Sequence, residues 1–192
     1  MSQPPRFGGV AIFVAATAIL AALVHLAVVL LTPMVATRDA FARLAALGGV
    51  NETVALPRAA PSERLTPSAD PALAQAFCRY DLASGPLRVR APVGRAGFAS
   101  ISFHTRRGLV FYAFTDKAAA HGVMEAVLAT PQQIRALAAR DNEDDPSPDL
   151  RVPAPASEGF VVIRAFSELP SLYAAAETEA RGLACKTEAI PP

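Results

Sequence analysis

The segment Phe7–Leu31 most constrains what this chain can fold into, because His25 is its only ionisable side chain. An α-helix rises about 1.5 Å per residue, so these 25 residues can cross a hydrocarbon layer of roughly 30 Å. The run exceeds the apolar stretch of about 7–15 residues in a signal peptide, and Arg6 is the only basic residue before it. The sequence therefore predicts a retained transmembrane signal anchor over residues 1–36, with a cleaved signal peptide as the alternative.

The remainder of the chain contains two cysteines, Cys78 and Cys185, near the two ends of the expected domain. An even pair is typical of a disulfide formed in an oxidising compartment, while two buried free thiols are the alternative. The basic residues decide little about orientation, because Arg6 precedes the span while Arg38 and Arg43 follow it. We therefore expect a single-pass protein of the bacterial inner membrane with its soluble domain in the periplasm.

Residues 37–71 are expected to connect the span to the domain. A short helix capped by Thr37 is predicted from the apolar residues at helical spacing between Phe41 and Leu47. We expect this helix to dock against another surface, because it has only two basic residues, and a position at the membrane surface is the alternative. Four prolines then fall within the fifteen residues 57–71, which is typical of an extended spacer. We expect this spacer to hold the domain away from the bilayer.

Residues 72–192 are expected to form the domain, beginning with a short helix or turn over Ala72–Phe77. Alternating or uniformly apolar runs then predict five strands. These runs are Leu87–Ala91, Phe98–Phe103, Leu109–Phe114, Val123–Leu128 and Gly159–Phe166. Helices are predicted later, over Pro131–Ala139 and after Ser167. The predicted fold class is α+β: an N-terminal transmembrane helix, then a small antiparallel β-rich, sandwich-like domain with late helices.

A hairpin is predicted between Phe98–Phe103 and Leu109–Phe114. The second of these strands is apolar on both faces, so we expect it to be central in its sheet, with Phe111 in the core. On the first strand, Phe103 is expected to face the core, while Ser102 and His104 share the opposite face.

The run from Cys78 to Pro92, followed by Phe98–Tyr112, resembles the domain-of-unknown-function family numbered twelve-fifty-four. The resemblance covers about Ala72 to Phe166 and rests on Asp-Leu, small residues, Gly-Pro and an alternating strand. It implies the short alphaproteobacterial form of the family, which has one N-terminal span and a β-rich envelope domain. It also implies work beside a separately encoded partner domain, and it transfers no catalytic residues.

The chain contains the residue types of a serine nucleophile with a histidine base. The residues concerned are Ser100, Ser102, His104, His121, Asp81 and Asp116. No Gly-x-Ser-x-Gly turn accompanies them, and serines on a strand face usually form its solvent side. We therefore predict no catalytic residues, and a hydrolase that uses the Ser/His strand face is the alternative.

The three histidines are scattered in the sequence, with His25 in the span, His104 near the hairpin turn and His121 before a glycine. A zinc site requires several His or Cys ligands at short spacings. The acidic run Asp141–Asp145 lacks the turn-forming glycine of a calcium loop and ends at Pro146. We therefore predict no metal site and no cofactor.

Charge is divided unevenly along the domain. Arg79–Lys117 contains seven basic and two acidic side chains, a net charge of +5, whereas residues 118–192 contain six and eleven, a net charge of −5. The whole chain carries +1, so nucleic-acid binding is not expected. This distribution fits two solvated faces of a dipolar domain. The alternative is a basic patch that binds anionic headgroups or an acidic partner. That patch would consist of Arg88, Arg90, Arg106 and Arg107.

These features predict a single-pass envelope protein that contacts membrane lipid through its N-terminal helix. Its domain is expected to be a non-enzymatic binding or assembly module for a protein partner. A small membrane-tethered hydrolase remains the alternative function.

Overall fold

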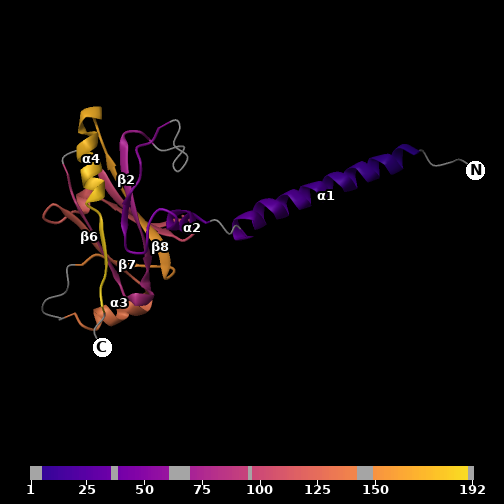
Figure 1. Ribbon diagram of the computed structural model, residues 1–192. Helices are drawn as coiled ribbons and strands as arrows, with labels where there is room; N and C mark the ends of the chain where they lie inside the picture. The colour runs from indigo at the N-terminus through magenta and orange to yellow at the C-terminus, as the bar shows by residue number, and fades with distance from the viewer. Residues whose placement is uncertain (1–5, 36–38, 61–69, 95–96, 142–148, 190–192) are drawn as a thin grey trace, which may run out of the picture. The chain divides into compact units, whose positions relative to one another are not determined.

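The computed structural model describes residues 6–35, 39–60, 70–94, 97–141 and 149–189. The chain forms two compact units, Met1–Arg38 and Asp39–Pro192. The first unit contains the helix α1 (Arg6–Val35) (Figure 1). Its segment Gly8–Thr32 has a mean hydropathy of 2.6, and none of it is buried against other residues. The predicted apolar N-terminal helix is thus confirmed, and its length and composition fit a membrane anchor.

The second unit is built on two β-sheets (Figure 1). The first sheet has the order β1 (Thr53–Ala55), β2 (Leu73–Asp81), β8 (Glu158–Phe166), β4 (Ala99–Thr105) and β5 (Val110–Thr115). The second sheet has the order β7 (Arg151–Pro153), β6 (Val123–Ala129), β3 (Leu87–Pro92) and β9 (Ala184–Thr187). Neighbouring strands are antiparallel except β6 and β7, which are parallel. The predicted α+β fold with antiparallel sheets and late helices is confirmed.

Short helices complete the second unit. They are α2 (Ala40–Ala45), η1 (Leu82–Ser84), η2 (Asp116–Ala118), α3 (Pro131–Ala138), η3 (Pro170–Leu172) and α4 (Tyr173–Arg181). The predicted capping box of α3 is present, because Thr130 accepts from the Gln133 backbone while the Gln133 side chain accepts from the Thr130 backbone. Ala176 and Ala180 place α4 against the main core.

The main core lies between the sheets and follows the alternation of each strand. On β2, Ala74, Ala76, Cys78 and Tyr80 belong to this core, whereas Phe77 belongs to a second cluster on the other face. The Tyr80 hydroxyl donates to the backbone carbonyl of His104 at 3.3 Å, and burial raises the pKa of this phenol. The first sheet therefore has apolar contacts on both faces. The outer face, which carries Phe77, contributes to the site described below.

The segment Ala72–Phe77, predicted as a helix or turn, lies mainly in β2, so that prediction was wrong. Its alanines favour a helix locally, but β2 pairs with β8 along all nine residues from Leu73 to Asp81. Alternate alanines, Ala74 and Ala76, fit the space between the sheets. Long-range pairing and burial override the local propensity here.

The predicted hairpin is confirmed as β4 and β5, in which Phe103 pairs with Tyr112. The expected central position of the second strand was wrong, because β5 is the edge of the first sheet and pairs only with β4 among the described strands. Val110 is 48% exposed, and Phe111 is only partly buried next to an irregularity in the register. Phe114 is the β5 side chain that enters the core.

The sequence analysis expected residues 37–71 to connect the span to the domain. In the structure, residues from Asp39 onward belong to the second compact unit. Asp39 caps α2, while the predicted cap Thr37 lies outside the described residues. The strand β1 pairs with β2, so residues 57–71 join two neighbouring strands of one sheet. That this run holds the domain away from the bilayer stays a prediction. Residues 61–69 of this run lie outside the described part of the chain.

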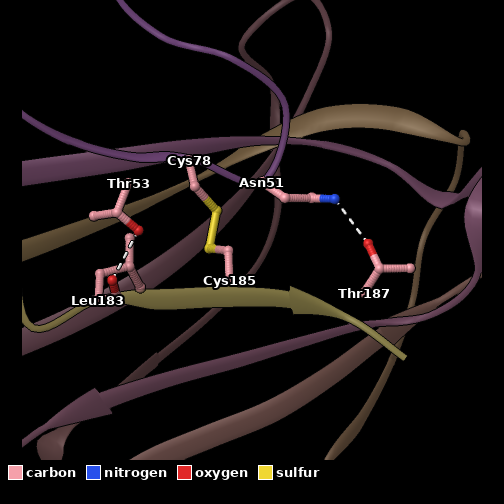
Figure 2. The surroundings of a disulfide bond; sticks show 6 residues. All are labelled: Asn51, Thr53, Cys78, Leu183, Cys185 and Thr187. Atoms are coloured by element: carbon pink, nitrogen blue, oxygen red, sulfur yellow. Dashed lines mark hydrogen bonds between the residues drawn. A yellow bond between two sulfur atoms is a disulfide. The ribbon is translucent and has the colours of Figure 1, made fainter. Parts of the chain in front are cut away.

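The predicted disulfide between Cys78 and Cys185 is present, with the two Cα atoms 6.7 Å apart (Figure 2). Cys78 lies on β2 of the first sheet, and Cys185 lies on β9 of the second. The sequence analysis did not predict β9. The bond therefore crosses the core and joins the last strand of the domain to the opposite sheet.

Two hydrogen bonds flank the disulfide (Figure 2). The Thr53 hydroxyl donates to the carbonyl of Leu183 at 2.8 Å, and the Asn51 amide nitrogen donates to the Thr187 hydroxyl at 2.7 Å. Together with the disulfide they connect the β1 edge of the first sheet to β9. We call this set of three links the seam.

Replacing Phe103 by Ala should destabilise the domain by about 3–5 kcal/mol, because this ring is fully buried and contacts three other aromatic rings. Phe111→Ala should cost less than about 2 kcal/mol, since part of that ring is already exposed. Urea unfolding measures both, with Phe98→Ala, at a residue that is 45% exposed, as the control. Equal losses for Phe103 and Phe111 would contradict the edge position of β5.

Removing the disulfide with the double variant Cys78→Ala, Cys185→Ala should lower the free energy of unfolding by about 4–5 kcal/mol. The reason is that the bond closes a loop between residues 107 positions apart and so restricts the unfolded chain. Chemical unfolding under oxidising conditions measures the loss, and reductant added to the unaltered chain serves as the control. Recovery of both cysteines as free thiols from membrane extracts would show that the bond does not form in the cell.

Candidate functional site

A groove of about 330 Å³ lies where α2 covers the outer face of the first sheet. We call it the α2 groove. Its apolar lining comes from α2, the segment after it, β1 and the central strands. These side chains are Leu44, Leu47, Leu56, Phe77, Phe160 and Val162. Its polar lining consists of Arg43, Gln75, His104 and Arg164. An apolar cleft with a few convergent polar groups is the usual form of a small-molecule site.

Two arginines hold α2 in place through Phe41, whose ring is almost completely buried. The guanidinium carbon of Arg79 lies 4.6 Å from the ring centroid, and that of Arg106 lies 5.1 Å from it. Arg106 also donates through Nε to the Asp39 carboxylate at 2.7 Å. The hydrogen bond from the Ala42 backbone, followed by that from Arg106, lowers the pKa of Asp39. The helix that forms one wall of the groove is therefore fixed at its first turn.

The polar part of the groove is built on a contact between Ser102 and His104 on β4. Ser102 Oγ lies 2.9 Å from His104 Nε2, and Arg164 Nη1 on β8 donates to the same hydroxyl at 2.9 Å. His104 Nδ1 lies 3.2 Å from the carbonyl oxygen of Gly108. Because a carbonyl only accepts, Nδ1 carries the proton, and Nε2 is left to accept from the Ser102 hydroxyl.

His104 is held in its neutral form. Burial lowers its pKa, the hydrogen bond to Gly108 acts in the opposite direction, and the charge of Arg164 lowers it further. The ring also stacks on Phe160, with the centroids 4.7 Å apart and the planes within 10° of parallel. The histidine is therefore a fixed and uncharged part of the groove wall.

Arg164 is the charged group at the centre of the site. It lies between Gln75 of β2 and Ser100 of β4 in the sheet register, so its neighbours on both sides are polar but uncharged. Burial lowers its pKa. Within the described residues, Ser102 is its one hydrogen-bonding partner, and no carboxylate lies within ion-pair distance of it. Four of the five N–H donors of this half-buried guanidinium thus have no hydrogen-bond partner among the described residues.

The structure brings together Ser102 and His104, the pair that the alternative hydrolase requires, but no carboxylate of the described residues hydrogen-bonds to His104. Asp81 accepts from the Ala83 backbone at the start of η1, and Asp116 begins η2, so neither contacts His104. Ser102 is only 5% exposed and its hydroxyl is already bonded to Arg164. Its most evident role is to hold Arg164 in position.

The four arginines of the expected basic patch lie in two separate parts of the domain. Arg88 and Arg90 lie on β3, and Arg106 and Arg107 lie in the turn between β4 and β5. Arg88 contacts Glu125, Asp149 and Glu188. Hydrogen bonds, first from Asp149 and then from Glu188, raise the pKa of Arg88. Arg90 pairs with Glu125 at 3.1 Å, and Arg106 pairs with Asp39 and Glu158.

These ion pairs leave Arg107 as the member of the expected patch with no ion pair among the described residues. The paired arginines also explain the predicted charge division, since basic residues of the earlier part face acidic residues of the later part. Solvated ion pairs of this kind contribute little to stability individually. A role of the four arginines in binding stays a prediction.

Other sequence candidates lie apart from the groove. His25 lies in α1, and His121 is exposed in a turn with a φ of 54°. Within the described residues, no group of three or more His, Cys, Asp or Glu side chains is placed to hold a metal ion. Asp141 pairs with Arg151 at 2.6 Å, whereas residues 142–148 of the acidic run lie outside the described part.

The sequence analysis missed Arg164 and the surface of the first sheet on which α2 docks. A signal for the arginine was present, because Arg164 is the only charged residue within the otherwise apolar run Gly159–Phe166. A charge in a central strand is costly unless it meets a partner or a ligand. The position of α2 had no comparable signal, since it depends on contacts with strands far away in the sequence.

Comparison with known proteins shows likeness in fold alone. No protein-family model matches the chain, and no curated protein matches it. The VPA0106 protein from Vibrio parahaemolyticus is similar in structure, with a TM-score of 0.50 and 13% identity, over 73% of this chain and 31% of that chain. An uncharacterized protein from Burkholderia cenocepacia has a TM-score of 0.41 and 16% identity, over 65% of this chain and 32% of that chain. The chain thus spans about a third of the length of these solved chains.

The free energy of unfolding should depend on pH through His104. Its pKa in the folded domain lies below the value of about 6.5 expected when unfolded, so between these two values the unfolded chain binds more protons. Stability from this group is therefore complete above about pH 6.5 and is lost as the pH falls through the folded pKa. Urea unfolding at a series of pH values measures this slope, and His104→Gln is the control that should remove it. Parallel profiles for the two proteins would contradict the burial of a neutral His104.

Proposed function

We propose that this chain is a single-pass protein of the bacterial inner membrane whose domain works in the periplasm as a non-enzymatic binding or assembly module. The observation that carries the proposal is the combination of α1 with the disulfide Cys78–Cys185. An apolar helix of this length supports an anchor in the membrane. A disulfide that joins two sheets supports an oxidising compartment, because such bonds are rare in the cytosol.

A partner protein is supported by the resemblance of Ala72–Phe166 to the family numbered twelve-fifty-four, which implies work beside a separately encoded partner domain. The exposed Arg107, and Arg90 with a side chain that is 56% exposed, are candidates for contacts with an acidic partner.

Topology and partner binding can be tested in one strain. A periplasmic reporter fused after Pro192 should be active, and deletion of residues 1–38 should abolish that activity, because α1 is the part that directs the domain across the membrane. Affinity purification of the full chain after cross-linking in intact cells should recover one protein in a fixed ratio to it.

The test variant for partner binding is Arg107→Glu, which reverses an exposed charge at a residue that belongs neither to the seam nor to the lining of the α2 groove. If Arg107 contacts an acidic partner, recovery of that protein should fall while the amount of anchored chain stays the same. Activity of a cytoplasmic reporter at the same fusion point would overturn the periplasmic assignment. Recovery of the chain alone after cross-linking would overturn the partner.

A further inference from the structure

The α2 groove combines an apolar lining with two arginines, Arg43 and Arg164, that have no ion pair among the described residues, and Arg164 is the less exposed of the two. Burial of an unpaired charge is unfavourable, so such a group is retained where it gains a partner in another state. Arg164 presents free N–H donors beside a neutral histidine and the amide of Gln75. An anion is the chemical class that would pair with this guanidinium.

We propose that the α2 groove binds a medium-chain aliphatic carboxylate, with its carboxylate on Arg164 and its alkyl chain along the apolar wall. This goes beyond the proposed partner binding, because it assigns a small-molecule site to the domain. The guanidinium group presents pairs of parallel N–H donors, and two oxygens of one carboxylate match that spacing. Ser102 holds the guanidinium from the side, through Nη1 at 2.9 Å.

The charge of the site favours a monoanion. Of the two arginines that line the groove, Arg164 is the half-buried one, and His104 beside it is held neutral. Arg43 also lines the groove, but its side chain is exposed on α2, where water screens its charge. A single carboxylate is balanced by Arg164, whereas a phosphate monoester brings more negative charge than one guanidinium compensates.

The apolar wall determines the rest of the ligand. Phe77, Phe160 and Val162 form the floor on the sheet, and Leu44 of α2 and Leu47, which follows α2, pack against them. None of these five side chains offers a hydrogen bond, so they select an alkyl chain over a polar one. The groove volume of about 330 Å³ lies at the small end of ligand sites, which suits a short chain.

The experiment is equilibrium dialysis of labelled octanoate against the full chain in phosphatidylcholine nanodiscs, with empty nanodiscs subtracted. Octanoate should bind saturably, one molecule per chain. Arg164→Gln should weaken binding by about tenfold or more, because the charge-assisted hydrogen bonds to the carboxylate are lost. Leu47→Asn, at the apolar end of the groove, should also weaken it.

Arg107→Gln is the matched control, because it removes an exposed arginine outside the groove and should leave octanoate binding unchanged. Formation of the Cys78–Cys185 disulfide and an unaltered urea midpoint verify that each variant is folded. A photoreactive octanoate analogue provides a second measurement, since it should label residues of α2 or β8 in the unaltered chain. That labelling does not depend on any variant folding correctly.

Three other eight-carbon ligands test which headgroup the groove recognises. Octyl phosphate and octylamine should bind more weakly than octanoate. Octanol, which lacks the charge, should bind no better to the chain in nanodiscs than to empty nanodiscs. The proposal is overturned if octanoate binding is unchanged in Arg164→Gln, if octyl phosphate binds more tightly, or if no saturable binding exceeds that of empty nanodiscs.

Discussion

The pairing of β2 with β8 is the interaction on which the rest of the domain depends. Nine consecutive residue pairs join these strands at the interior of the first sheet, from Leu73 with Phe166 to Asp81 with Glu158. Side chains alternate between the faces of a strand, so this register decides which residues enter the core and which form the outer face. A shift by one residue would exchange the two sets.

The two faces created by that register have different roles. On the inner face, Cys78 meets Cys185 and completes the seam that joins the sheets. On the outer face, Phe77 and Val162 are paired across the strands and form the floor beneath α2. The disulfide stabilises the domain from one side of the sheet without contacting the groove on the other side. Stability and ligand contact are therefore carried by separate residues of the same two strands.

The outer face also shows how a polar group is accommodated in a central strand. Arg164 is next to Gln75 on one side and lies close to Ser102 on the other, so its neighbours are polar without cancelling its charge. His104 remains neutral and accepts from the Ser102 hydroxyl, which leaves that oxygen free to accept from Arg164. The arrangement orients the guanidinium and keeps it available. A carboxylate in place of Gln75 would instead form a permanent ion pair with Arg164.

Features decided over short distances in the sequence were predictable. The length of the apolar run sets α1, the Thr130–Gln133 box begins α3, and alternation identifies β3 and the β4–β5 hairpin. The even pair of cysteines indicated the disulfide, but nothing in the sequence analysis indicated that Cys185 lies on a strand, β9. The helix predicted at the start of β2 and the central position expected for β5 were wrong, because each depends on which strand lies beside it. The environment of Arg164 and the α2 groove likewise come from residues that only tertiary packing brings together, since burial and charge pairing are set by spatial neighbours.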